Sequence, residues 1–334
     1  MRAFGIQATW RPAYDWSMGD NPKSIKRKAT VAPILQANWD VVIDHPIDLL
    51  PRRSLTIENV SSLLAEKHFA LWKENLSENQ IKQVSQARIG VVHRFESAAH
   101  IGKDEQESKD FVERAIACLH IIRPARGRVQ TIQLQILDDA DVDVFRFTHP
   151  EETQPNIPQS DVLNTIRTQD FSTLQSVLPK FLSLWDGGPH HIFRAVRYFL
   201  TGYSGIHEPI AQVLIWVAGI EAVLSKGEPL GPSETVHELF TSINGDWNIY
   251  EDSALCEFTK VDVQLRQIGE DIFKLRNLFA HGGWIPEEWV GKTGRPSTTG
   301  TVEYAEMLRE ASAAILRKLL MNWLTNKAAS TQVA

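Results

Sequence analysis

The chain has 334 residues, of which 43 % are apolar and 23 % are charged, and its net charge is −6. This composition is typical of a globular protein and excludes wholesale disorder. The negative charge excludes attraction of nucleic acid by the chain as a whole, so any such contact needs a local basic patch. With only two cysteines, Cys118 and Cys256, a disulfide framework and a cysteine-based zinc module are also excluded, and a reducing compartment is expected.

No targeting or membrane segment is expected. The N-terminal residues lack a continuous apolar run. The most apolar stretch, 210–224, is too short for a membrane span and contains Gln212 and Glu221. We therefore predict a cytoplasmic protein with no membrane partner, in which this stretch is a buried helix.

The first half has the pattern of a mixed α/β domain. Short β-branched runs predict strands at 41–47 and 88–95, and 109–122 predicts a helix. Residues 128–147 predict a hairpin, because apolar and polar residues alternate along its first strand as they do in a half-buried strand. A basic cluster upstream predicts a solvated turn; its members are Lys23, Lys26, Arg27 and Lys28.

The second half is almost entirely helical in pattern. Loops rich in glycine and proline separate the predicted helices, which gives an α-helical bundle. These helices are expected at 189–202, 207–226, 233–244, 252–281 and 302–325.

The two halves together predict an α+β fold. A proline-rich polar stretch, 149–161, is the clearest loop or linker. We expect a mixed α/β domain of unknown role over 1–160, a linker with a short helix over 161–188, and a helical bundle over 189–326.

The helix predicted to end at residue 281 carries the most informative pattern. Its apolar residues are spaced three and four apart and predict a seam against neighbouring helices. Gly282 and Gly283 then end the helix. The opposite face carries Glu270, Lys274, Asn277 and His281.

Three residues near this helix end suit phosphodiester chemistry. Asn277 and His281 are four residues apart, so their side chains can touch. Histidine can transfer a proton near neutral pH, and the guanidinium of Arg276 can stabilise charge that develops on a phosphate. The alternative is that Asn277 and His281 are ordinary solvated residues and that Arg276 forms a salt bridge.

This motif resembles the R-x4-6-H motif of HEPN domains. The surrounding segments, WVAGIEAVLS at 216–225 and FKLRNLFAHGG at 273–283, resemble the Apea-like branch of that family. The resemblance covers about residues 189–325 and does not reach the first half.

The resemblance implies a helical bundle that dimerises and cuts RNA without a metal or another cofactor. In that family two motifs, one from each protomer, meet at the dimer interface, and the 2′-hydroxyl of RNA attacks the adjacent phosphate to leave a 2′,3′-cyclic phosphate. Here His281 would be the general acid and base, Arg276 the cation at the phosphate, and Asn277 the residue that orients the pair. The family also implies a role in prokaryotic defence or toxin-like growth arrest.

Five further residues are candidates for a role beside this motif. Glu221 lies in an apolar helix, where a carboxylate needs a partner; it either forms a structural ion pair with Arg194, Arg197 or Arg276, or positions Arg276. Arg194 and Arg197 share a helix face and are candidates for RNA binding, although a solvated face explains them as well. Beyond the motif, Lys292 and Arg295 are candidate phosphate contacts in the loop at 282–300.

The favoured function is thus a homodimeric, metal-independent endoribonuclease with RNA as its substrate. The alternative is a non-catalytic HEPN module for dimerisation or for nucleotide or partner binding. In either case the N-terminal domain is a candidate receiver of a protein or ligand trigger.

Overall fold

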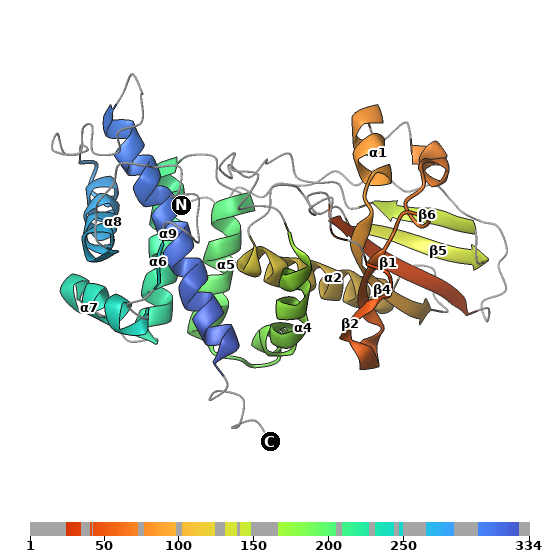
Figure 1. The fold of residues 1–334 in the computed structure, drawn as a ribbon, viewed down its shortest axis with the longest axis horizontal. Helices are drawn as coiled ribbons and strands as arrows, with labels where there is room; N and C mark the ends of the chain where they lie inside the picture. The colour runs from red at the N-terminus through yellow and green to blue at the C-terminus, as the bar shows by residue number, and fades with distance from the viewer. Residues whose placement is uncertain are drawn as a thin grey trace, which may run out of the picture.

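The protein, described here from a computed structural model, has an α+β fold. A sheet lies at one side of the molecule and a group of helices at the other, with α2 (Lys103–Ile122) and α4 (Thr168–Leu182) between them (Figure 1). The structure describes residues 25–34, 41, 43–72, 77–97, 102–123, 131–138, 141–147, 166–204, 209–226, 231–243, 247–249, 265–283 and 300–326.

The sheet has six strands in the order β2-β3-β4-β1-β5-β6, and every neighbouring pair is antiparallel. Its central pair, β1 and β4, keeps one register from Lys26 opposite Ser97 to Ile34 opposite Ile89. The strands are β1 (Lys26–Ile34), β2 (Ile47–Leu50), β3 (Leu55–Asn59), β4 (Ile89–Ser97), β5 (Ile132–Asp138) and β6 (Asp141–Phe147).

Two of the three strand predictions are confirmed. The predicted hairpin forms from β5 and β6, and the strand expected at 88–95 forms most of β4. The strand expected at 41–47 is wrong, because β2 begins only at Ile47. Pro46 precedes that residue and has no N–H to donate to a ladder.

The basic cluster near the N-terminus is part of a strand, so the predicted solvated turn is wrong. Lys26, Arg27 and Lys28 open β1, whereas Lys23 lies outside the described residues. Lys28 is 3 % exposed and forms an ion pair with Glu105 of α2. The strand escaped prediction because it is central and buried on both faces, so its sequence does not alternate.

Both faces of the sheet are covered. One face packs against α2, which starts six residues before the predicted 109 because its first turns are polar. The other face buries apolar side chains under η2 (Glu66–Trp72) and α1 (Glu78–Ser85). The polar side of β5 was expected to face solvent, but Gln133 is buried and donates to the carbonyl of Glu105 over 3.0 Å.

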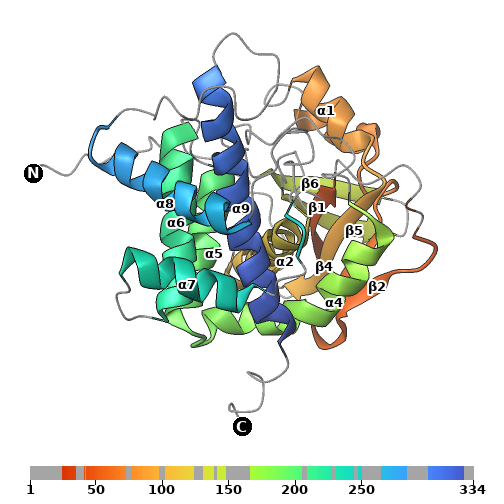
Figure 2. The same ribbon diagram turned by 60° about the vertical axis from the view of Figure 1, so that its left-hand side comes forward.

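The five helices predicted in the second half are confirmed. The start expected for α8 at 252 lies outside the described residues. Both α7 and α8 lie at the end of the molecule farthest from the sheet (Figures 1 and 2). The bounds are α5 (His190–Ser204), α6 (Pro209–Ser225), α7 (Pro232–Ser242), α8 (Leu265–Ala280) and α9 (Gly300–Thr325), and short 3-10 turns occur at η1 (Pro51–Arg53) and η3 (Ser183–Trp185).

Close helix contacts in the bundle depend on glycines. A Cβ at Gly202 of α5 would lie 2.1 Å from Nε1 of Trp216 on α6. A Cβ at Gly219 of α6 would lie 2.5 Å from Cδ2 of Leu316 on α9. Since such distances are well inside van der Waals contact, α6 can approach both neighbours this closely only because these positions have no side chain.

One hydrophobic core extends from the α2 face of the sheet into the bundle. It contains buried residues of β4, α2, α4, α6 and α9. The predicted linker, 161–188, contains α4, and Phe171 and Phe181 of this helix belong to the same core. The division into domains at 1–160 and 189–326 therefore stays a prediction.

Candidate functional site

The end of α8 has the hydrogen bonds of a Schellman cap. The N–H of Gly283 donates to the carbonyl of Leu278 over 2.7 Å, and the N–H of Gly282 donates to that of Phe279 over 3.3 Å. Gly282 has a φ of 69°, which glycine adopts without strain. The cap places His281 directly after Ala280, the last residue of α8, and His281 is exposed there.

The face of α8 opposite Asn277 and His281 packs against the bundle. The predicted seam is buried at Ile268, Ile272 and Leu275. Next to it, Asp271 accepts a hydrogen bond of 2.7 Å from the hydroxyl of Tyr304 on α9, and both residues are buried. This anchoring fixes which side of α8 faces outward.

Arg276 lies on the flank of the seam and connects two helices. Its Nη2 is 3.4 Å from Oε2 of Glu221 on α6, and its Nη1 donates to Oδ1 of Asn277 over 2.9 Å. The side chains of Arg276 and Glu221 are 38 % and 35 % exposed. Of the three arginines considered as partners of Glu221, the structure thus pairs Arg276 with it.

This chain of contacts orients the amide of Asn277. Its Oδ1 accepts a hydrogen bond from Arg276, so its NH₂ group is the part of the amide that can donate a hydrogen bond to a bound molecule. Asn277 and His281 both line a groove between α7 and α8, and Asn277 is half-buried there.

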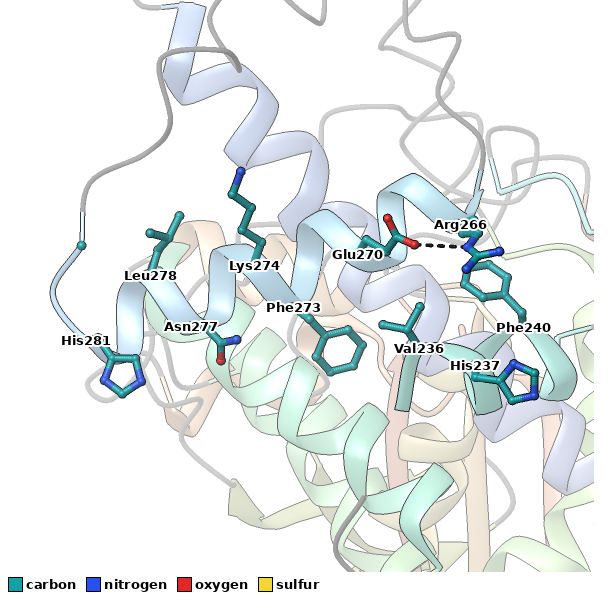
Figure 3. Close-up of a pocket in the computed structure, with 11 residues that line it drawn as sticks. Val236, His237, Phe240, Arg266, Glu270, Phe273, Lys274, Asn277, Leu278 and His281 are labelled. Carbon is teal, nitrogen blue, oxygen red and sulfur yellow. Dashed lines mark hydrogen bonds and ion pairs between the residues drawn. The ribbon is translucent and has the colours of Figure 1, made fainter. Parts of the chain in front are cut away.

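The groove has a volume of about 730 Å³ and runs along α8. His281 and Asn277 lie at one end, and Arg266, His237 and Phe240 lie at the other (Figure 3). His281 follows Arg266 by 15 positions, which corresponds to about 22 Å of helix at about 1.5 Å per position. The remaining lining residues are Val236, Glu270, Phe273, Lys274, Leu278 and Gly283.

Among the described residues that line the groove, basic groups outnumber acidic ones. The lining contains one carboxylate, Glu270, and four basic residues: Arg266, Lys274, His237 and His281. The groove can therefore hold an anion although the chain as a whole is negative.

Two of the other predicted RNA contacts, Arg194 and Arg197, do not line this groove. Arg194 and Arg197 are exposed on α5, apart from the residues that line it. Burial lowers the pKa of His191, beside Arg194, and the positive charges of Arg194 and Lys226 lower it further. Lys292 and Arg295 lie outside the described residues.

The described part of the chain offers little to a metal or to thiol chemistry. Within it, no group of three or more His, Cys, Asp or Glu side chains is arranged to hold a metal ion. Cys118 is buried, and this burial raises the pKa of its thiol, which disfavours the reactive thiolate. None of the helices described combines the length and hydropathy that a membrane span requires.

Several lining residues were not predicted, among them His237, Phe240 and Arg266. The spacing of His237 and Phe240 places them on one face of a helix. Only the packing of α7 beside α8 shows that this face borders the same groove as His281.

No family model, curated protein or solved structure matches this chain.

Proposed function

We propose that the protein is a metal-independent endoribonuclease of the HEPN type that acts as a homodimer, in prokaryotic defence or toxin-like growth arrest. The observation that carries the proposal is the chain from Glu221 through Arg276 to Asn277, next to an exposed His281 at the rim of a groove. It combines a cation, an oriented amide and a proton carrier at one helix end.

The reaction needs two proton transfers. A base takes the proton of the RNA 2′-hydroxyl as its oxygen attacks the adjacent phosphorus. An acid gives a proton to the 5′-oxygen as the P–O bond breaks. The products are a 2′,3′-cyclic phosphate and a 5′-hydroxyl, so no water, metal or oxidant is consumed.

A single protomer supplies too few groups for both transfers at this helix end. In a two-fold dimer, His281 acts as the base and the partner's His281 as the acid. Arg276 stabilises the negative charge on the phosphate oxygens, and Asn277 donates a hydrogen bond to them. The outward position of Asn277 and His281 supports such an arrangement.

The test is cleavage of a mixed RNA pool in EDTA, with analysis of the product ends. His281→Ala is expected to lower cleavage about 10²- to 10⁴-fold, the usual contribution of general acid–base catalysis. Arg276→Lys is expected to rescue poorly, because lysine lacks the planar fork of arginine. His190→Ala, which removes an exposed histidine of α5, is the matched control.

Three results would contradict the mechanism: dependence on magnesium, 3′-hydroxyl ends, or cleavage of RNA with methylated 2′-hydroxyls. Light scattering should show a dimer at micromolar concentration. A dimer that does not cleave RNA, even with its trigger supplied, would favour the non-catalytic HEPN module. One observation favours that alternative: Arg276 is already engaged with Glu221.

A further inference from the structure

The groove continues well beyond the proposed catalytic end. Its far end is built from α7 and the first turn of α8, and brings together His237, Phe240 and Arg266 (Figure 3). Arg266 precedes His281 by about 22 Å of helix, and Phe240 packs beside Gly269, about 18 Å of helix before His281. Both are too distant to act on the bond that His281 would break. A role for them must concern another part of the bound molecule.

Phe240 is a half-buried aromatic residue whose ring is held by the backbone of α8. A Cβ at Gly269 would lie 3.4 Å from Cζ of this ring and 3.2 Å from Cδ2 of Leu239. The glycine therefore forms a notch against which α7 packs. A ring that is fixed at one edge and borders a groove can stack on a flat ligand with little loss of side-chain entropy.

Arg266 is an exposed cation of the groove. Its side chain is 75 % exposed, and its Nε is 3.1 Å from Oε1 of Glu270, which is 46 % exposed. Exposed pairs between residues four apart on a helix are weak. An incoming phosphate can therefore replace Glu270 as the partner of this guanidinium.

We propose that this far end is a subsite for one nucleotide of the single-stranded RNA that flanks the cleaved bond. The base stacks on Phe240, and Arg266 contacts the phosphate. The inference rests on the proposed ribonuclease function. An aromatic face beside a cation in a positively charged groove is the arrangement with which proteins bind single strands, whose bases are free to stack.

The first experiment measures binding without turnover. Fluorescence anisotropy of a labelled single-stranded uridine oligonucleotide is recorded with the His281→Ala protein and with the same protein carrying a second change. Phe240→Leu keeps an apolar side chain against Gly269 but removes the aromatic face, so we expect binding about 5- to 150-fold weaker. Phe111→Leu removes a half-buried ring of α2 that does not line the groove, and this matched control should bind as before. Equal melting temperatures confirm that the variants are folded.

The second experiment uses the carboxylate that competes for Arg266. Glu270→Gln frees Arg266 and removes a negative charge, so RNA should bind several-fold more tightly. Glu107→Gln is the matched control, because Glu107 pairs with Arg53 over 3.2 Å at a comparable exposure on α2. Arg266→Ala should reduce the slope of log affinity against log salt by about 0.7, the value for one phosphate contact on a single strand.

The outcomes separate the two proposals. Unchanged RNA affinity in Phe240→Leu, Glu270→Gln and Arg266→Ala overturns the subsite, even where wild-type protein cleaves RNA. The expected affinity changes without cleavage by wild-type protein support the subsite and overturn the nuclease. Equal binding of single-stranded RNA and of the matching duplex also overturns the stacking assignment.

Discussion

Two polar clusters of this protein have opposite environments. Between the sheet and α2, the ion pair of Lys28 and Glu105 is buried, and the hydroxyl of Ser108 donates to Oγ1 of Thr30 over 2.7 Å. On α8, the side chains of the ion pair formed by Arg266 and Glu270 are 75 % and 46 % exposed.

The difference teaches which polar groups are available to a ligand. A buried polar group is costly unless it is fully paired, so the cluster under α2 specifies how that helix sits on the sheet. Glu105 shows this most clearly, because it pairs with Lys28 and also accepts the N–H of Gly102 at the start of α2. The side chains of Arg266 and Glu270 in the groove are exposed to water and weakly paired, so they can exchange partners at little cost in free energy.

The largest expected effect is the loss of the buried pair. Lys28→Met leaves the carboxylate of Glu105 buried without its cation, and the free energy of unfolding should fall by about 3–5 kcal/mol. In Arg266→Met the same quantity should change by less than about 0.5 kcal/mol. Urea unfolding of both variants measures the contrast, and equal losses would contradict the distinction between the clusters.

The next effect concerns the end of α8. Gly282→Ala forces alanine into a positive φ of 69° and should cost about 1–2 kcal/mol of stability. Gly187→Ala is the matched control, because Gly187 also has a positive φ and, as at Gly282, an added Cβ meets no described atom within 4 Å. Both variants should lose stability in thermal unfolding, but only Gly282→Ala should also slow RNA cleavage, since it disturbs the cap that places His281.

The sequence predicted the elements that have one clear pattern. The seam of α8, its outward residues and its glycine end were all visible, because they depend on spacing within one helix. Strand β1 was missed for the opposite reason: it is buried on both faces and opens with charged residues. Only tertiary contacts show that Lys28 is paired across 77 positions of the chain.

In the candidate site, too, the residues of one helix could be predicted and the contacts between helices could not. Arg276, Asn277 and His281 follow from a local motif, and the partner of Glu221 was narrowed to three arginines. Choosing Arg276 among them required the packing of α6 beside α8. Phe240 and Arg266 were not predicted, because nothing within α7 or α8 alone indicates that the two helices border one groove.

A smaller effect on stability depends on pH and concerns His120 of α2. Burial lowers the pKa of His120 to about 4, so the folded protein favours the neutral ring. The neutral ring of His120 therefore contributes to the free energy of unfolding. The contribution is complete above about pH 6.5, the pKa of an unfolded histidine, and is lost as the pH falls toward 4. Wild type should lose about 1 kcal/mol more stability than His120→Gln between pH 7.5 and 5.5. Denaturant unfolding at both pH values tests this, and His190→Gln should behave as wild type does.

Another small effect on stability is expected for Glu221. Its pair with Arg276 is 3.4 Å long and more than one-third exposed, so Glu221→Gln should lower the free energy of unfolding by less than about 1 kcal/mol. If Glu221 positions Arg276 and, through it, the amide of Asn277, the same change should lower kcat about tenfold, as expected for the loss of a hydrogen bond to a charged group. A positioning role leaves KM nearly unchanged, because RNA binding along the groove is intact. A lower melting temperature with an unchanged kcat would contradict the positioning role. The pair of Glu221 and Arg276 would then only stabilise the bundle, as the buried pair of Lys28 and Glu105 stabilises the contact between α2 and the sheet.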